Sequence, residues 1–377
     1  MSRSISVAVN MLWCIPGEVG GSEEYLVRQL SGLAAIESNY DVTIYAPRGF
    51  SGIHPDLASA HRIVEAPSTC RRREIRILLE HTWLTKQVEQ SEIVHHGGGV
   101  VPSRSSRPTL LTIHDLQYLT FPEYFSTHKL KYLQNRVPSS VSRSTAVAVP
   151  SAYVANSLSK SFPISPDKIR IVRHGVSESL GKNATSESDL RHRFGLGEAE
   201  ILFLPAITHP HKNHEFLLQL LANEWTAPNL RLVFAGGEGR AESAVQQRIV
   251  ELGLSDRVVR IGRVSPNDRD GLIKLSLALV FPSSYEGFGA PVLEAMKLGT
   301  PVIASNETAL PEVIGAAGLT LPLTIGAWSG AIDQVRTRRI ELTELGFRRA
   351  AEFTDIESAQ DLCLAYERVL SRGLGWQ

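Results

Sequence analysis

Two glutamates eight positions apart, Glu286 and Glu294, lie on either side of a glycine-rich turn. An apolar run before the turn predicts a strand, and Pro291 suits the first turn of an amphipathic helix after it. Gly287 and Gly289 allow backbone N–H groups to approach a ligand, and the helix start adds partial positive charge. These features predict a diphosphate site with Glu286 towards a sugar and Glu294 towards a ribose. The alternative is a glycine-rich turn with two solvated glutamates.

Polar or glycine-rich turns also follow several other predicted strands. Ligands of open parallel α/β sheets bind at the carboxyl ends of the strands, so the residues of these turns are candidates for one site. A single histidine, lysine or glycine pair in such a turn is also compatible with a purely structural role. The candidate residues are Gly20, Gly21, His114, Asp115 and Gly236.

Short β-rich runs alternate with longer helix-patterned stretches along the chain, which predicts α/β architecture with parallel sheets. Residues 175–188 are polar and lack strong hydrophobic periodicity, so we place a domain boundary there. Each half then supplies five or six strands, enough for one doubly wound sheet. The predicted strands are 5–9, 42–46, 93–95, 110–113, 145–149, 169–172, 201–205, 230–235, 258–261, 277–281 and 301–304.

The composition excludes several classes of protein. The chain has 377 residues, too many for one ordinary domain, and 43% hydrophobic and 21% charged residues are typical of a globular protein. Lys+Arg and Asp+Glu both number 39, which disfavours nucleic acid as the main partner. Cys14, Cys70 and Cys363 form no disulfide or zinc pattern, which favours a reducing cytoplasm. No apolar run approaches the ~20 residues of a membrane-spanning helix.

The stretch 284–306, continuing to Leu310-Pro311-Glu312-Val313, resembles the Glu-x7-Glu donor-binding signature of the glycosyltransferase family 4 (group 1) enzymes. This resemblance implies the GT-B fold, in which two Rossmann-like domains face each other across a cleft. It also implies an acceptor-side domain over 1–178, joined by a C-terminal helix 355–377, and a nucleotide-sugar domain over 179–354.

The resemblance extends to the other marked turns. Pro210-His211-Lys212-Asn213 resembles the family's Pro-Arg-Lys-Asn turn, whose cations neutralise the departing diphosphate. His211 replaces an arginine, and Ala206 stands where some members carry a second one, so we expect Lys212 and a protonated His211 to meet the phosphate charge. The turn at His114 resembles the family's histidine turn beside the reactive sugar.

The resemblance implies a set of site residues. The catalytic residues are expected to be His114, Lys212 and Glu286, and the acceptor side is expected to include Asp115 and Tyr118. No metal site is expected. The donor-binding residues are expected to be Gly20, Gly21, His211, Lys212, Gly236, Arg263, Val264, Glu286, Gly287, Phe288, Gly289, Ala290, Pro291 and Glu294.

Three further motifs do not support a separate function. Asp268-Arg269-Asp270 mimics a metal-binding Asp-x-Asp, but it lies in a polar, helix-patterned stretch and not after a strand, so we expect both carboxylates to be surface residues. His95 and His96 are adjacent on a predicted strand end and should point to opposite faces, although His96 could still line a cleft. Arg71-Arg72-Arg73 precedes an amphipathic helix, which leaves a peripheral contact with a membrane surface open beside the commoner solvated helix face.

The expected activity, as the resemblance implies, is retaining transfer of a hexose from a nucleotide sugar to a carbohydrate or glycolipid acceptor. Similarity to bacterial mannosyltransferases of polysaccharide biosynthesis favours GDP-mannose as donor, without a cofactor. UDP-glucose or another hexose donor, a sugar-nucleotide epimerase or phosphorylase, and a non-catalytic nucleotide-sugar-binding subunit remain alternatives. A dinucleotide oxidoreductase is disfavoured because no Gly-x-Gly-x-x-Gly opens the first helix.

Overall fold

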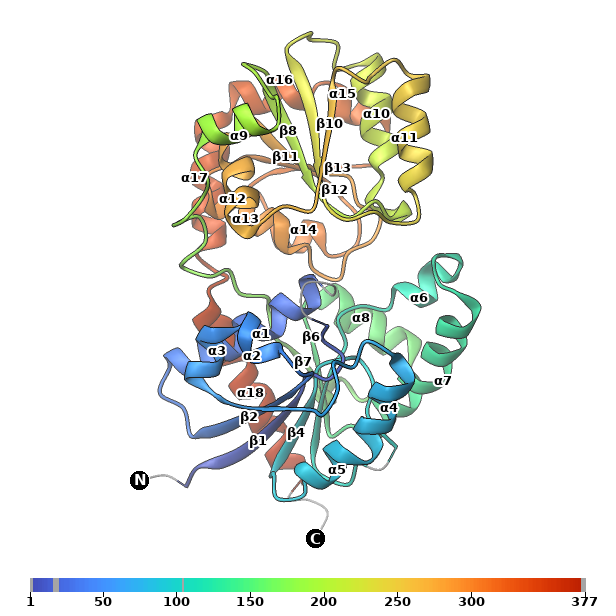
Figure 1. Cartoon of the computed structure of the whole chain (residues 1–377), viewed down its shortest axis with the longest axis vertical. Helices are drawn as coiled ribbons and strands as arrows, with labels where there is room; N and C mark the ends of the chain where they lie inside the picture. The colour runs from blue at the N-terminus through green and yellow to red at the C-terminus, as the bar shows by residue number, and fades with distance from the viewer. Residues whose placement is uncertain (1–2, 16–19, 104, 374–377) are drawn as a thin grey trace. The chain divides into compact units, whose positions relative to one another are not determined.

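The computed structural model describes residues 3–15, 20–103 and 105–373. Residues 17–19 of the first glycine-rich turn therefore lie outside the described residues. The chain divides into two compact units (Figure 1). Unit 1 comprises Met1–Gly175 and Thr354–Gln377, and unit 2 comprises Val176–Phe353.

The borders of the units differ by one to three residues from the predicted domain limits at 178 and 354. The N–H of Val176 donates to the carbonyl of Phe353 at 2.7 Å, which ties both residues to unit 2. A Cβ added to Gly175 would lie 2.6 Å from the carboxyl of Asp355, so the last residue of the first segment packs closely against the returning helix of unit 1. These two contacts fix the border at residues 175–176 and 353–354.

Within the described residues, seven parallel strands form the sheet of unit 1, in the order β3-β2-β1-β4-β5-β6-β7. The order reverses between β1 and β4, and this reversal is the topological switch point of the sheet. The strands are β1 (Ile5–Asn10), β2 (Tyr40–Ala46), β3 (Arg62–Glu65), β4 (Ile93–His96), β5 (Thr109–Thr112), β6 (Ala146–Val149) and β7 (Ile169–Ile171).

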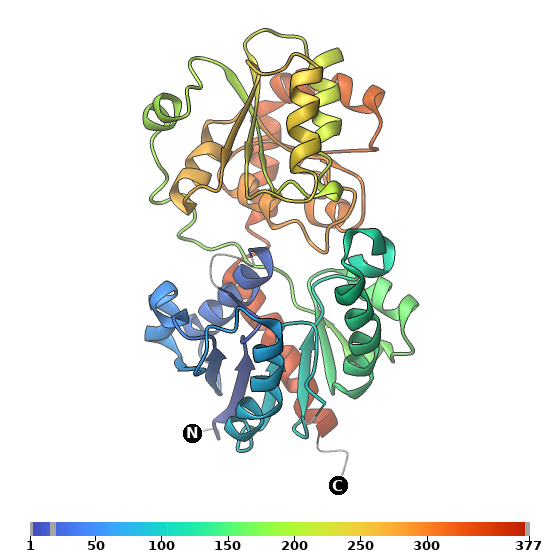
Figure 2. The same cartoon turned by 45° about the vertical axis from the view of Figure 1, so that its right-hand side comes forward.

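Helices cover both faces of this sheet (Figures 1 and 2). Side chains alternate along β1, so that Val7 and Val9 pack with α1 and α18 while Ala8 packs with α5 on the opposite face. The α-helices of unit 1 are α1 (Gly21–Ala35), α2 (Phe50–Ile53), α3 (Pro55–Ala60), α4 (Arg73–His81), α5 (Trp83–Gln87), α6 (Gln117–Thr120), α7 (Thr127–Arg143), α8 (Ala152–Ser161) and α18 (Asp355–Gly373). The short 3-10 helices are η1 (Pro122–Tyr124) and η2 (Pro166–Lys168).

Unit 2 has six parallel strands in its described residues, in the order β10-β9-β8-β11-β12-β13, with the switch point between β8 and β11. The strands are β8 (Glu200–Pro205), β9 (Leu230–Ala235), β10 (Val258–Gly262), β11 (Ala278–Phe281), β12 (Val302–Ser305) and β13 (Leu319–Leu321). The helices are α9 (Glu187–Arg193), η3 (Pro210–Lys212), α10 (His214–Asn223), α11 (Glu242–Glu251), α12 (Pro266–Leu275), α13 (Ala290–Lys297), α14 (Leu310–Ile314), α15 (Ile325–Ser329), α16 (Ala331–Thr337) and α17 (Arg339–Ala350).

The predicted α/β class with two doubly wound parallel sheets is confirmed, and each predicted strand appears within a few residues of its expected limits. The sequence analysis missed β3 and β13. Both are short edge strands with only two apolar residues each, whereas the equally short β7 supplies three apolar residues together with Val172.

The Asp268-Arg269-Asp270 motif lies in the first half of α12, where the structure corrects its predicted surface character. Asp268 is 9% exposed and accepts hydrogen bonds from Thr185 at 2.6 Å and Arg193 at 2.8 Å. Asp270 is 7% exposed and accepts the N–H of Gly181 at 2.8 Å. Both carboxylates therefore fasten the 176–186 segment to α12.

We expect Asp268→Ala to lower the free energy of unfolding by on the order of 1–3 kcal/mol, because it leaves Thr185 and Arg193 without their buried acceptor. Asp256→Ala removes an exposed carboxylate of the same unit and should change the free energy of unfolding by less than about 0.5 kcal/mol. Urea unfolding of both variants measures the difference, and equal stabilities would contradict a structural role for Asp268.

Candidate functional site

An ion pair joins two loops at the switch point of unit 2. Lys212, in the loop after β8, donates to the Oε1 atom of Glu286, in the loop after β11. Both side chains are mostly buried, and the Lys212 ammonium also lies 5.1 Å from the ring centroid of Phe281. The structure therefore brings together two of the three predicted catalytic residues, and it does so through a direct contact that the sequence did not indicate.

Further hydrogen bonds hold these two loops together. The N–H of Ser284 donates to the His211 carbonyl at 2.8 Å, and the Asn213 amide donates to the Pro282 carbonyl at 2.8 Å. The N–H of Glu286 donates to the Thr308 hydroxyl at 2.9 Å, so the loop after β12 supports the same turn. Thr308 was absent from the predicted site. Its φ of 55° lies in the left-handed region, a feature that the sequence does not show.

The predicted helix start after Glu286 is confirmed, because α13 begins at Ala290 with Pro291 in its first turn. Gly289 precedes the helix with φ 96°, a conformation that strongly favours glycine, and as the N-cap residue it has no side chain to cap the first N–H groups. The start of α13 therefore presents backbone donors and partial positive charge beside Glu286. Phe288 is buried, with its ring 5.9 Å from that of Phe353, and anchors the turn to the core of unit 2.

Glu294 lies one turn into α13 and is only 2% exposed. Its Oε2 atom lies 3.8 Å from the guanidinium of Arg269 on α12. Arg269 was considered in the sequence only as the middle of the Asp-x-Asp motif, and its contact with Glu294 connects that motif to the predicted ribose-binding residue.

The loops after β8, β9 and β10 meet at the same edge of the sheet. The N–H of Gly236 donates to the Gly262 carbonyl at 2.8 Å, and the N–H of Gly239 donates to the Thr208 hydroxyl at 2.7 Å. A Cβ added to Gly237 would lie 2.8 Å from the Nε atom of Arg263, so this guanidinium packs directly over the glycine turn. Gly236 and Arg263 are thus close together, and Val264 follows on the rim of the core of unit 2.

The structure corrects the expectation that His211 is protonated. Burial, together with the smaller effects of the nearby Lys212, His209 and His214, lowers the pKa of His211 to about 3. The ring stacks at 5.8 Å on that of His209. Because His211 is neutral at physiological pH, Lys212 is left to supply the permanent charge of this turn.

We therefore expect the affinity for GDP to show no histidine-dependent fall between pH 6 and 8, because a ring with its pKa near 3 does not change charge in that range. His211→Gln should leave the pH dependence of the affinity unchanged. Calorimetric titration of wild type and variant at three pH values measures it. A fall in the GDP affinity of wild type from pH 6 to 8 that His211→Gln abolishes would show that His211 changes its charge in this range.

His114, the third predicted catalytic residue, follows β5 in unit 1. Its Nε2 atom lies 2.8 Å from the Gly97 carbonyl, and its ring lies 5.3 Å from Tyr25 and 5.8 Å from Trp13. Burial lowers the pKa of His114, which favours the neutral ring. A neutral ring that donates from Nε2 to a carbonyl offers Nδ1 as an acceptor, so His114 can orient a ligand hydroxyl but has no second proton to donate.

The remaining predicted residues of unit 1 have different environments. Gly20 has φ 74° and precedes α1, which Gly21 begins. Asp115 is exposed and accepts the N–H of Gln117 at 2.9 Å, so it stabilises its own turn. Tyr118 is 4% exposed, and its hydroxyl has no hydrogen-bond partner among the described residues. Burial raises the pKa of Tyr118 to about 12, so its hydroxyl keeps its proton.

His95 and His96 point to opposite faces of the sheet, as predicted. His95 contacts Tyr366 and Thr112, whereas His96 contacts Asn10. His96 lines a cavity within unit 1. Among the described residues, no group of three or more His, Cys, Asp or Glu side chains is arranged to hold a metal ion.

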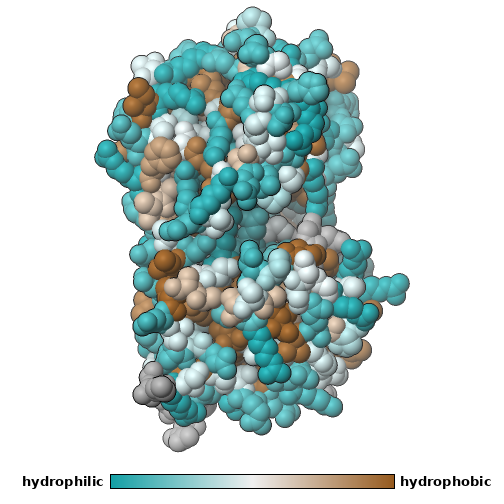
Figure 3. All heavy atoms as spheres, turned by 60° about the vertical axis from the view of Figure 1, so that its left-hand side comes forward, coloured by the Kyte–Doolittle hydropathy of each residue, from teal (hydrophilic) through white to brown (hydrophobic). Residues whose placement is uncertain are grey.

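The described helices include none that is both long and apolar enough to cross a bilayer. The face seen in Figure 3 is mostly hydrophilic, with apolar residues in separate small groups. The arginine-rich segment leads into α4, where Leu78 is 61% exposed and Ile75 is 39% exposed.

Two family models together match most of the chain. The model of glycosyl transferases group 1 matches residues 187–342, and the model of glycosyltransferase family 4 matches residues 19–180. The chain belongs to the group 1 glycosyltransferases of family 4. The resemblance stated from the Glu286–Glu294 segment is therefore confirmed, and the two matches fall on the C-terminal and N-terminal halves of the sequence.

Two bacterial relatives are named mannosyltransferases. O-antigen chain mannosyltransferase B of Escherichia coli is 30% identical over 253 residues, which cover 65% of this chain and 66% of that protein. O-antigen chain mannosyltransferase RfbU of Salmonella typhimurium is 30% identical over 232 residues, which cover 61% of each. The chain thus spans no more than about two thirds of the length of these relatives.

The glycosyltransferase fold is confirmed by similarity to solved structures. Anabaena HepE, in complex with UDP and glucose, superposes with a TM-score of 0.74 and 17% identity. The match covers 96% of this glycosyltransferase and 99% of HepE.

Proposed function

We propose that this family 4 glycosyltransferase moves a hexose, mannose from GDP-mannose, to a carbohydrate or glycolipid acceptor with retention at the anomeric carbon. The observation that carries the proposal is the Lys212–Glu286 pair beside the start of α13, at the switch point of the unit 2 sheet. The names of the two O-antigen mannosyltransferases support mannose as the transferred sugar.

Lys212 and the first N–H groups of α13 would bind the donor diphosphate and stabilise its charge as the bond to the sugar breaks. A phosphate at Lys212 would compete with Glu286 for the ammonium group, because the two acceptors are both anionic. Glu286 would then be available to accept hydrogen bonds from the sugar hydroxyls. The pair in the donor-free protein thus keeps both side chains partnered until the donor arrives.

Glu294 would bind the ribose hydroxyls, and Gly236, Arg263 and Val264 would contribute to nucleotide binding from the neighbouring loops. Burial alone would disfavour a charged Glu294, but Arg269 at 3.8 Å supplies an opposite charge. His114, Gly20 and Gly21 belong to unit 1. His114 would orient a sugar hydroxyl through Nδ1, and Gly20 and Gly21, at the start of α1, stay predicted donor-binding residues.

The proposal assigns the phosphate charge to Lys212 and a helix start, and it includes no metal ion. Activity should therefore persist when EDTA is in excess. Strict dependence on manganese or magnesium would contradict this part of the proposal.

A UDP-hexose is the second candidate donor, because the structurally similar HepE was solved with UDP and glucose. A non-catalytic nucleotide-sugar-binding subunit is the remaining alternative. A transferase and a binding subunit differ in turnover, since a binding subunit would be stabilised by the nucleotide sugar without consuming it.

The proposal is tested by measuring nucleotide release from GDP-mannose, UDP-glucose and ADP-glucose, with and without EDTA, alongside the thermal stability of each mixture. We expect stabilisation by GDP-mannose and slow release of GDP, accelerated by a mannose-containing acceptor. Release from UDP-glucose alone would identify the second donor. Stabilisation without release in any mixture would identify a binding subunit.

A further inference from the structure

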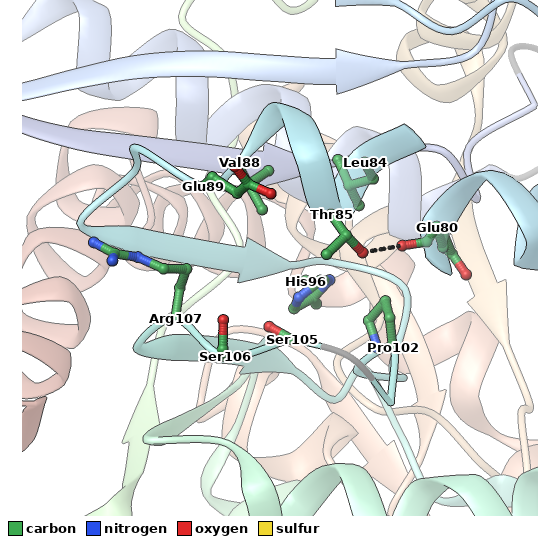
Figure 4. A pocket seen from close by; sticks show the side chains of 10 residues that line it. All are labelled: Glu80, Leu84, Thr85, Val88, Glu89, His96, Pro102, Ser105, Ser106 and Arg107. Atoms are coloured by element: carbon green, nitrogen blue, oxygen red, sulfur yellow. Dashed lines mark hydrogen bonds between the residues drawn. The ribbon is translucent and has the colours of Figure 1, made fainter. Parts of the chain in front are cut away.

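Two adjoining cavities lie within unit 1. Their volumes are about 180 and 270 Å³, and Glu80 and Pro102 line both. They lie beside the connection between β4 and β5, which contains no helix among its described residues and leaves α5 next to an irregular segment. Figure 4 shows the first cavity, with the side chains of His96 and Ser105 beside it.

Asn10 determines which protons His96 offers to this cavity. The Asn10 Oδ1 atom accepts the N–H of Leu12 at 3.1 Å, so its Nδ2 is the donor and lies 3.1 Å from His96 Nδ1. His96 Nδ1 is therefore an acceptor, and the proton of the neutral ring is on Nε2. Burial lowers the pKa of His96 to about 3, which keeps the ring neutral.

Three polar groups of this cavity are available to a ligand. His96 is 2% exposed, and its Nε2 has no hydrogen-bond partner among the described residues. The buried Ser105 hydroxyl likewise has no partner there. The Glu80 carboxyl is 9% exposed and accepts only a long bond, of 3.4 Å, from Asn10 Nδ2 among the side-chain hydrogen bonds of the described residues. Leaving such groups unpaired would be costly, so the cavity offers hydrogen-bonding groups to a polar ligand.

The arrangement matches the chemistry of a sugar ring. A hydroxyl group both donates and accepts, so neighbouring hydroxyls can accept from His96 Nε2 and donate to Glu80. Leu84, Val88 and Pro102 provide the apolar wall that the C–H face of a pyranose ring requires. The first cavity is lined by two carboxyl groups, Glu80 and Glu89, and one guanidinium, Arg107, so it has no excess of cationic groups that would favour an anion.

We propose that this cavity binds a neutral sugar unit of the acceptor, with His96 and Glu80 recognising adjacent hydroxyls. The inference rests on the proposed transferase function and assigns it an acceptor subsite. Its location supports the assignment. Asn10 and His96 end β1 and β4, the two strands at the switch point of unit 1, and the next residue, Gly97, accepts the hydrogen bond from His114.

The test uses methyl α-D-mannopyranoside as the probe and measures its affinity by ligand-observed NMR titration of the full chain. We expect saturable binding by wild type and a loss of about tenfold to a hundredfold in Glu80→Gln, which removes the carboxyl acceptor but keeps the side-chain shape. Glu74→Gln, which changes an exposed carboxylate of the same helix, α4, is the matched control and should bind like wild type.

Ser105→Val provides a second variant that does not depend on a buried charge. It removes an unpartnered hydroxyl and fills part of the cavity, so it should maintain or raise thermal stability while weakening probe binding at least severalfold. A protein damaged merely in its fold would lose stability and binding together.

The outcomes separate the cavity from the donor site. Equal probe affinity in wild type, Glu80→Gln and Ser105→Val, or no saturable binding by wild type, would overturn the proposal and leave a cavity filled by water. GDP affinity, measured in parallel, should be the same in all these proteins. If the probe binds as expected but no nucleotide sugar is consumed, the proposed transferase function fails while the carbohydrate site stands.

Discussion

Replacing Lys212 with alanine is expected to lower the rate of sugar transfer by about 100- to 1000-fold, the usual effect of removing a group that stabilises developing charge. Lys212 is the permanent side-chain cation of the loop after β8, because His211 is neutral. The substitution also leaves Glu286 without its ion-pair partner beside the donor phosphates, so donor affinity should fall as well. The measurement is kcat and KM for GDP-mannose, together with calorimetric GDP affinity.

Two further variants make this prediction specific. Lys182→Ala removes an exposed lysine of the same unit and should leave the rate unchanged. Glu286→Ala should lower kcat with less effect on GDP affinity, because GDP lacks the sugar that Glu286 is proposed to hold. A Lys212→Ala enzyme as active as wild type would remove this lysine from the mechanism.

The protein is expected to lose stability steeply as the pH falls below about 6.5. Burial lowers the pKa of His95, His96 and His211 to about 3 and that of His214 to about 4. Above pH 6.5 these residues are neutral in both the folded and the unfolded chain. Below it the unfolded chain binds protons that the folded chain does not, which costs up to about 1.4 kcal/mol per pH unit for each histidine.

Urea unfolding at pH 7.5, 6.5 and 5.5 measures this loss. His95→Gln removes one titrating group and retains a polar side chain for Thr112 or Tyr366, so the pH dependence should become shallower by up to about 1.4 kcal/mol per pH unit. His128→Gln, at an exposed position, should leave it unchanged. The same dependence in all three proteins would show that His95 is not buried and neutral.

The central strands and the turns after them could be predicted from the sequence because both leave local patterns. Apolar runs mark the buried strands, and the Glu286–Glu294 segment combines a strand end, two glycines and a helix start within a few residues. The edge strands β3 and β13 carry no comparable pattern. Their positions depend on pairing with β2 and β12 rather than on their own sequence.

The electrostatics of the candidate site could not be predicted from the sequence. The contact between Lys212 and Glu286 joins loops far apart in the chain, and Arg269 approaches Glu294 only because α12 packs near α13. The expected charge on His211 was wrong because the sequence does not show how deeply the loop is buried. Asp268 resembled a surface residue for the same reason, since its partner Arg193 comes from a different helix.

The central claim, that the loops after β8 and β11 bind a nucleotide sugar, is tested most directly by hydrogen–deuterium exchange with and without GDP-mannose. We predict slower exchange in peptides covering residues 208–216 and 284–297, which include Lys212, Glu286 and the start of α13. The same peptides should show less protection in the Lys212→Ala variant. Nucleotide-sugar binding that leaves both peptides unprotected in wild type would contradict the account.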